Sequence, residues 1–260
     1  MPDVLLRYGD HPSQYGELTL PPGPGPWPVV VVLHGGFWRA AYGCELGAPL
    51  AADLVEHGAA TWNLEYRRVG DDPRAGGGGW PHTVLDVAAG VDLLATLGQQ
   101  AAEGQLDLSR VVALGHSAGG HLAGWLAGRT ALAPGAPGAS PLVAVCGFVS
   151  QAGVLDLALA VEDHLGNGAA ADFLGADLAG ALPLASPVEL VPTGVRSVCV
   201  HGSADDVVPL NQSESYVAAA TRAGDDARLA VQPGADHMAP IDLGSPVWAA
   251  CRAAVLELTR

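Results

Sequence analysis

The chain has 260 residues, of which 49% are hydrophobic, and carries a formal net charge of −15 at pH 7. This length and apolar content suit one large α/β domain with a substantial core. The acidic balance argues against binding to nucleic acid or to an anionic membrane surface, because both need a basic face. All 12 basic residues are arginine, so chemistry that requires a lysine side chain is excluded.

Four cysteines lie far apart in the sequence and form no C-x-x-C pair. We interpret them as buried small hydrophobic residues of a reducing compartment. The first residues lack the basic and apolar regions of a signal peptide, and no apolar run approaches the roughly 20 residues of a membrane span. We therefore expect a cytoplasmic protein that binds no membrane. The sequence calls for no metal or cofactor, and it is compatible with a homodimer.

Strand-like and helix-like segments alternate along the chain. Residues 29–33 form a continuous β-branched run, which is typical of a strand buried on both faces. Strands are predicted at residues 4–6, 17–20, 29–33, 60–66, 111–114, 143–149, 196–200 and 227–231. Helices are predicted at residues 46–57, 83–100, from 118 onward, 210–222 and 246–258. Repeated β-then-α units predict a mostly parallel sheet with helices on both faces.

Residues 155–192 interrupt this alternation. They are rich in Ala, Leu, Gly and Asp, contain helical pieces and include no convincing strand. We interpret them as a small cap insertion over the carboxyl ends of the strands, within a single domain that spans residues 1–260. The alternative is an ordinary long crossover.

The most informative motif is Gly115-His116-Ser117-Ala118-Gly119, which directly follows an apolar strand and opens a helix. This is the G-x-S-x-G nucleophile elbow, in which a sharp turn exposes a serine at the carboxyl end of the sheet. The flanking glycines are required because side chains there would collide with the neighbouring strand and helix. The motif makes Ser117 the candidate nucleophile.

A serine nucleophile needs a base, and the base needs an acid that orients it. After the predicted strand at 196–200 comes an H-G-x-x-D-x-x-V segment that contains Asp205, and after the last strand comes His237. Both lie in loops at the same sheet edge as the elbow. We favour Asp205 as the acid over Asp206 and Asp236, which read as a loop or capping residue and a turn former.

Acyl transfer also needs hydrogen-bond donors for the oxyanion. The central strand at 29–33 is followed by His34-Gly35-Gly36-Phe37-Trp38, a loop of the HGGG type. We predict that the backbone N–H groups of Gly36, Phe37 and Ala118 form the oxyanion hole. His34 is interpreted as a residue that braces this loop rather than as a base.

With these motifs the chain resembles the α/β-hydrolase superfamily. The H-G-G-F-W loop, the strand end Glu65-Tyr66-Arg67-Arg68 and the H-S-A-G-G-H elbow resemble the esterase/kynurenine formamidase-like group, which is related to hormone-sensitive-lipase-type esterases. The resemblance covers roughly residue 29 to the C-terminus. It implies an α/β-hydrolase fold, a triad of Ser117, Asp205 and His237, and the oxyanion hole named above. The third glycine of HGGG is replaced by Phe37, as in the H-G-G-x-W form.

The predicted function is a metal-independent serine hydrolase that cleaves small carboxylic esters or N-formyl amides through an acyl-enzyme. Aromatic residues near the site, Trp38, Trp80 and Phe173, are expected to line the substrate pocket, as is Phe37. Glu65, Arg67, Arg68 and Asp86 are interpreted as a structural charge cluster without a catalytic role.

Two alternatives stay open on the sequence alone. One is a small-peptide peptidase that resembles the prolyl oligopeptidase catalytic domain, although only about 28 residues precede the first central strand. The other is a non-catalytic small-molecule binding protein on the same fold. Activity on a panel of small peptides would distinguish the peptidase from the esterase. Labelling by a fluorophosphonate probe would distinguish an active serine hydrolase from the non-catalytic binding protein.

Overall fold

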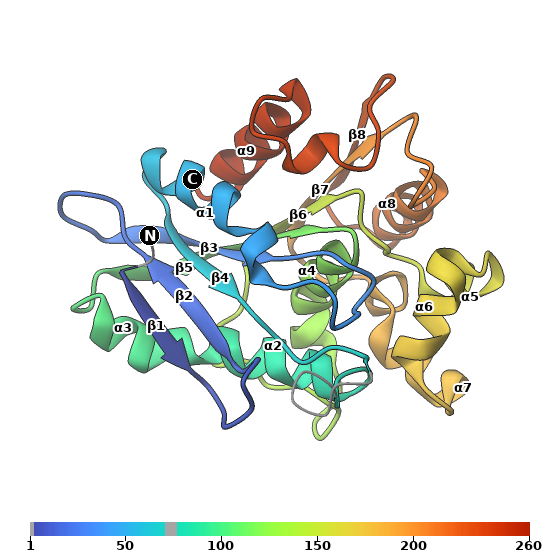
Figure 1. Ribbon diagram of the computed structural model, residues 1–260, viewed down its shortest axis with the longest axis horizontal. Coiled ribbons are helices and arrows are strands. Elements are labelled where there is room, and N and C mark those ends of the chain that lie inside the picture. The colour runs from blue at the N-terminus through green and yellow to red at the C-terminus, as the bar shows by residue number, and fades with distance from the viewer. Residues whose placement is uncertain (1–2, 71–76) are drawn as a thin grey trace.

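The described residues, 3–70 and 77–260 of this computed structural model, form an eight-stranded sheet (Figure 1). The strands are β1 (Val4–Arg7), β2 (Tyr15–Thr19), β3 (Trp27–Leu33), β4 (Ala60–Leu64), β5 (Leu106–His116), β6 (Gly147–Gln151), β7 (Arg196–Gly202) and β8 (Ala227–Gln232). Their order in the sheet is β1-β2-β4-β3-β5-β6-β7-β8. β2 pairs antiparallel with β1 and with β4, and all other pairs are parallel. The predicted mostly parallel α/β sheet is confirmed.

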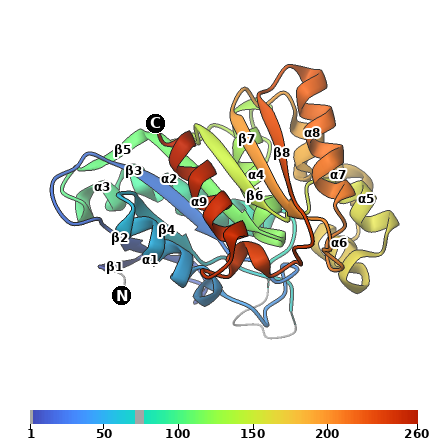
Figure 2. The same ribbon diagram turned by 90° about the horizontal axis from the view of Figure 1, so that it is seen from above.

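Helices cover both faces of this sheet (Figure 2). They are α1 (Ala48–Glu56), α2 (His82–Asp92), α3 (Leu97–Ala101), α4 (Ala118–Gly128), α5 (Leu157–Glu162), α6 (Leu165–Leu174), α7 (Leu178–Ala185), α8 (Asn211–Ala223) and α9 (Pro246–Leu258). Short 3-10 turns lie at Cys44–Leu46, Leu93–Ala95, Arg129–Ala131, Pro187–Leu190 and Ala239–Ile241. Side chains of α1 and α9 pack on one face, and those of α2, α4 and α8 pack on the other.

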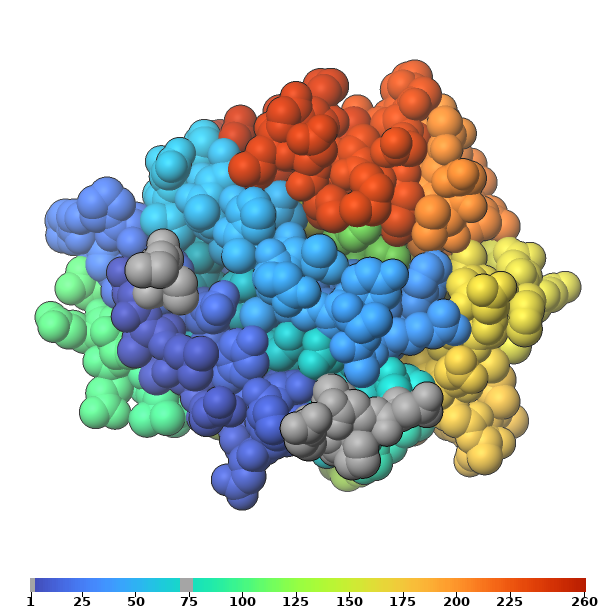
Figure 3. Space-filling model, viewed as in Figure 1, coloured from blue at the N-terminus to red at the C-terminus, as the bar shows by residue number. Residues whose placement is uncertain are grey.

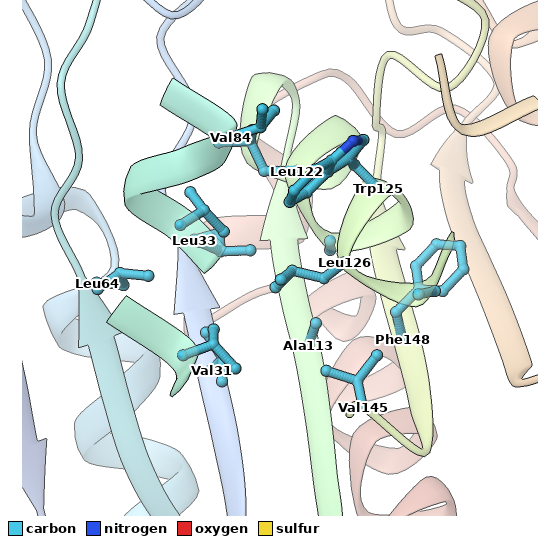
Figure 4. Packing of buried hydrophobic residues seen from close by; sticks show 14 of the residues in the cluster. Val31, Leu33, Leu64, Val84, Ala113, Leu122, Trp125, Leu126, Val145 and Phe148 are labelled. Carbon is cyan, nitrogen blue, oxygen red and sulfur yellow. The ribbon is translucent and has the colours of Figure 1, made fainter. Parts of the chain in front are cut away.

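The central strand β3 explains why its sequence is apolar without interruption. Successive side chains of a strand point to opposite faces. Val29 and Val31 belong to the core under α2 and α4, whereas Val30 and Val32 belong to the core under α1 and α9. Figure 4 shows Val31 in the first of these layers, near the α4 side chains that cover this part of the sheet.

The helix predicted at residues 83–100 is broken in the structure. α2 ends at Asp92, and α3 starts only after Thr96, whose φ and ψ are −122° and −93°. The N–H and the hydroxyl of Thr96 both donate to the carbonyl of Leu93, at 3.0 and 3.2 Å. A threonine side chain that binds nearby backbone competes with the helical hydrogen-bond pattern.

The strand predicted at residues 143–149 starts later than expected, at Gly147. The N–H of Val143 donates to the carboxylate of Asp92 at 3.1 Å, so this segment is bound to α2 rather than to a strand. Val143 and Val145 are nevertheless buried in the core. These residues are apolar because they are buried, not because they belong to a strand. The predicted start of the strand at residue 143 was therefore wrong.

Residues 155–192 hold α5, α6 and α7, and no strand occurs in this fully described stretch. These helices lie together beside α4 and α8 at one side of the molecule (Figure 1). Arg39 donates to the carbonyl of Gly166 at 2.9 Å, and the N–H of Trp80 donates to the carbonyl of Phe173 at 2.7 Å. The helices are thus bound to loops at the carboxyl edge of the sheet. Within residues 3–70 and 77–260, no helix is long and apolar enough to cross a membrane.

The glycines of the elbow have no room for a side chain. A Cβ at Gly119 would overlap the carbonyl oxygens of Leu33 and His34 at the end of β3, and one at Gly115 would overlap the carbonyl of Gly119. Both contacts are with backbone, which cannot move aside as a flexible side chain can.

Gly119→Ala is therefore expected to lower the free energy of unfolding by roughly 1–3 kcal/mol, the usual range for overpacking. The matched change Gly244→Ala places its Cβ 3.4 Å from Asp242 and meets no backbone. That control is expected to stay within about 0.5 kcal/mol of the parent. Urea unfolding followed by circular dichroism measures both, and equal midpoints for the two variants would contradict the steric argument.

Candidate active site

Ser117 occupies a strained turn between β5 and α4. Its φ and ψ are 55° and −118°, a conformation that costs a non-glycine residue of order 1–3 kcal/mol. The surrounding backbone holds it there. The N–H of Ser117 donates to Gln151 at 2.9 Å, and its carbonyl accepts from His121 at 3.2 Å. The side chain therefore stands at the edge of the sheet, at the N-terminus of α4, where the helix dipole favours negative charge.

Asp205 and His237 come together at this edge from the loops after β7 and β8. Nδ1 of His237 lies 2.8 Å from Oδ2 of Asp205, and both side chains are buried. The N–H groups of Val207 and Val208 donate to the other carboxylate oxygen, at 2.9 and 2.8 Å. Burial by itself raises the pKa of Asp205, but these hydrogen bonds and those of two histidines hold it well below the usual value. Asp205 is therefore an ionised carboxylate that fixes one imidazole nitrogen.

Asp236, one of the two alternative acids, forms other contacts. Oδ1 of Asp236 accepts the N–H groups of Met238 and Ala239, both at 3.0 Å, and so shapes the turn after β8. Its interpretation as a turn former agrees with these contacts. Asp205 is the acidic residue whose carboxylate contacts His237.

Two histidines that the sequence reasoning did not select support this pair. Nε2 of His201 donates to the carbonyl of Val208 at 2.9 Å and lies 3.4 Å from the Asp205 carboxylate. Nε2 of His116 donates to the carbonyl of His237 at 2.9 Å, and the two rings lie 4.6 Å apart. Burial and the nearby His237 lower the pKa of His116 to about 4. Their positions in the sequence could have identified them. His116 directly precedes the elbow serine, and His201 is the first residue of the H-G-x-x-D segment.

The loop after β3 approaches the serine closely. A Cβ at Gly35 would lie 3.0 Å from Nδ1 of His116 and 3.2 Å from Cβ of Ser117. Gly36, Phe37 and Trp38 all have positive φ, at 111°, 53° and 55°. This tight turn places Gly36 and Phe37 in the wall of the cavity that Ser117 also lines. As the first residue of α4, Ala118 has no carbonyl partner within the helix.

A cavity of about 180 Å³ opens beside Ser117. Its walls are mainly apolar and come from the segment between β3 and β4, the elbow at the end of β5, and the loops after β7 and β8. The lining residues are Gly35, Gly36, Phe37, Tyr42, Leu46, His116, Ser117, Val207, His237, Met238 and Ile241. The segments that supply these walls, blue after β3 and red after β8, meet on the face shown in Figure 3.

Three aromatic residues expected in the pocket do not line this cavity. Trp38 and Phe173 are each only 1% exposed, and their rings stack at 4.8 Å within the core. The indole of Trp38 donates to Nδ1 of His121 in α4 at 3.1 Å. Trp80 packs against the same core. The turn at positive φ sends Phe37 into the cavity and its neighbour Trp38 into the core.

Among residues 3–70 and 77–260, no group of three or more His, Cys, Asp or Glu side chains is arranged to hold a metal ion.

The eight-stranded sheet, the strained serine at its edge and the acid and histidine on later loops define an α/β-hydrolase. The chain belongs to the BD-FAE family, an α/β-hydrolase-type esterase family whose model matches residues 17–219. It is thus a hydrolase of the esterase group. No curated protein matches the chain.

Several solved structures share the whole fold at low sequence identity. A truncated carbohydrate esterase from gut microbiota is 20% identical with a TM-score of 0.77, over 99% of this chain and 97% of its own. Esterase 2 of Thermogutta terrifontis, phosphorylated by paraoxon, is 20% identical with a TM-score of 0.75, over 98% and 92%. An acetyl ester-xyloside bifunctional hydrolase from Caldicellulosiruptor lactoaceticus is 19% identical with a TM-score of 0.77, over 99% and 97%. They show that the fold is that of an α/β-hydrolase.

The buried neutral histidines make stability depend on pH. Burial lowers the pKa of His121 to about 4 from 6.5, and that of His116 falls as far. Between pH 6.5 and 4 the unfolded chain therefore binds protons that the native chain does not, so stability falls as the pH drops. Each residue is expected to contribute up to about 3 kcal/mol to this loss.

Unfolding free energies measured across pH 4–7 test this. His121→Gln, whose side chain does not titrate, should make the slope clearly shallower between pH 5 and 6.5, where the depressed pKa values of Asp205 and Glu65 contribute little. His57→Gln alters an exposed histidine and should leave the slope unchanged. The same slope in all three proteins would show that His121 is not a neutral buried group.

Proposed function

We propose that the chain is a serine esterase in which Ser117, His237 and Asp205 act as a catalytic triad. The observation that carries this proposal is the 2.8 Å contact between His237 and Asp205 beside a cavity that Ser117 and His237 both line. Because Asp205 accepts the Nδ1 proton, the neutral imidazole of His237 keeps a lone pair on Nε2, where a general base needs it.

The reaction would proceed through an acyl-enzyme. Ser117 Oγ attacks the ester carbonyl while Nε2 of His237 takes its proton, and the resulting imidazolium is stabilised by Asp205. The N–H groups of Gly36, Phe37 and Ala118 donate to the oxyanion of the tetrahedral intermediate. His237 then protonates the departing alcohol, and water, activated by the same histidine, releases the acid.

The cavity supports substrates with short acyl groups. Its volume of about 180 Å³ is below the roughly 300–1,000 Å³ of pockets for drug-sized ligands. The Phe37, Leu46 and Ile241 side chains provide apolar contact for a few carbon atoms. Among the structural neighbours, one is described as an acetyl ester-xyloside hydrolase and another as a carbohydrate esterase, which supports acetyl esters as a first substrate class. The formyl group of an N-formyl amide is smaller still, so the cavity volume also supports this substrate class as a candidate.

Ser117→Ala is expected to reduce kcat for p-nitrophenyl acetate by roughly 10⁴-fold or more and to abolish labelling by a fluorophosphonate probe. The loss follows because no other group would form the acyl-enzyme. Ser109→Ala, an exposed serine at the start of β5, serves as the control and should behave as the parent. A Ser117→Ala variant that hydrolyses the ester at the parental rate would refute the assignment.

Acyl-chain preference tests the cavity. For p-nitrophenyl esters, kcat/KM should fall at least about tenfold between four and ten acyl carbons, since a cavity of about 180 Å³ has no room for the extra methylenes, which would overlap its walls. Ile241→Ala enlarges one wall and should shift the optimum toward longer chains. N-formylkynurenine in the same panel compares formamide with ester cleavage. A flat profile over all chain lengths would show that this cavity does not hold the acyl group.

A further inference from the structure

The histidine that precedes the glycine loop, His34, is enclosed by hydrogen-bond acceptors. Its Nδ1 lies 2.7 Å from the carbonyl oxygen of Gly35, and its Nε2 lies 3.1 Å from Oε1 of Glu65. Both side chains are almost completely buried. The ring of Tyr66 stacks on that of His34 at 4.3 Å, and its hydroxyl donates to the His34 carbonyl at 2.7 Å. The imidazole is therefore fixed in one orientation.

Glu65 is an ionised carboxylate. Burial alone raises its pKa, but the contacts with His34, the Arg68 guanidinium and the Tyr66 N–H together bring that pKa below the usual value. The N–H groups of Tyr66 and Cys44 donate to it at 2.8 and 2.9 Å. A carboxylate that receives this many donors has no proton to give to His34.

The two acceptors define the charge of the imidazole. A backbone carbonyl has no proton, and neither has the ionised Glu65, so each contact requires a proton on the ring nitrogen. A neutral imidazole carries only one such proton. Both contacts are satisfied together only when His34 is an imidazolium.

Among the other titratable groups near His34, Tyr66, Cys44 and His116 are neutral, whereas Arg68 is charged. Burial raises the pKa of Tyr66 well above its usual value and that of the Cys44 thiol to about 12, so both stay neutral. His116, across the carboxyl ends of β3 and β5, is neutral because its pKa is about 4. Arg68 is the second cation of the cluster and contacts the far side of Glu65 at 3.2 Å.

The contact with Gly35 reaches the proposed oxyanion hole through one peptide group. The carbonyl of Gly35 and the N–H of Gly36 belong to the same trans peptide, in which the two bonds point in opposite directions. A proton donor on the carbonyl side therefore fixes the N–H on the other side, and Gly36 lines the cavity beside Ser117. A hydrogen bond from a cation also polarises the peptide, which strengthens its N–H as a donor.

We propose that His34 is held as an imidazolium by Glu65 and acts as a positioning residue that orients and polarises the Gly35–Gly36 peptide toward the oxyanion. This inference rests on the proposed esterase function for its catalytic consequence, whereas the charge of His34 rests on its contacts alone. It also gives Glu65, interpreted from the sequence as purely structural, a part in the site.

The protonation state is measured directly by ¹⁵N NMR of the histidine ring nitrogens in the full chain carrying Ser117→Ala, with the His34 signals assigned by comparison with a His34→Asn version. Similar shifts for both His34 nitrogens, each with an attached proton at pH 7, are expected. Shifts split into one protonated and one unprotonated nitrogen would overturn the proposal. Because no turnover is involved, this result does not depend on the esterase function.

The catalytic consequence is tested in the otherwise unchanged enzyme. His34→Asn keeps a short amide donor for the Gly35 carbonyl but removes the charge, and Glu65→Gln removes the counter-ion while leaving His34 in place. Each should lower kcat for p-nitrophenyl acetate by roughly 10–100-fold with little change in KM, less than the roughly 10²–10³-fold loss of a whole oxyanion donor. His57→Asn, an exposed histidine that also neighbours an aspartate, is the control and should retain parental kcat.

Fluorophosphonate labelling separates the failure of this proposal from that of the function. A parent enzyme that labels, together with His34→Asn and Glu65→Gln variants that keep parental kcat, would overturn the catalytic role of His34. A parent that neither labels nor hydrolyses esters would instead refute the proposed function and with it that role, while the NMR result would stand.

Discussion

The site depends on how closely the carboxyl ends of β3 and β5 approach each other. The first turn of α4 lies against the backbone carbonyls of Leu33 and His34, with only the Cα of Gly119 between them. On the other side, a Cβ at Gly35 would lie only 3.2 Å from Cβ of Ser117, so this position has little room for a side chain. Backbone packed directly on backbone leaves little freedom, because it has no rotamers to change. The strained serine and the glycine loop are therefore set in place by the same contact.

The histidines near this contact differ in their surroundings and therefore in their roles. His116 and His121 are buried against carbonyl groups and apolar side chains, and each stays neutral. Asp205, fixed by backbone N–H groups and His201, provides the negative charge that His237 faces. Identical side chains thus take different roles because their neighbours differ in the number of donors and acceptors. No composition or spacing argument contains that information.

The sequence was informative where local chemistry dictates the structure. The β-branched run of β3 and the glycines of the elbow predicted a doubly covered strand and a strand-to-helix turn, and both are present. Chain order was enough to bring Asp205 and His237 to one edge. It failed where tertiary contacts decide the outcome. The turn at Phe37 and Trp38 determines which ring faces the cavity, and the hydroxyl of Thr96 ends a helix that periodicity alone would continue.

The origin of the cavity walls has a consequence for how selectivity can change. Tyr42 and Leu46 lie before β4, whereas Val207, Met238 and Ile241 follow the last two strands, and none of these side chains holds Ser117, Asp205 or His237 by a hydrogen bond. The helices of residues 155–192 contribute no lining residue. These cavity walls therefore come from three loops, two of which also carry Asp205 and His237, but their side chains are not the proposed reacting groups. If the proposed triad holds, point substitutions in these walls would change the range of accepted esters while leaving the reacting groups in place.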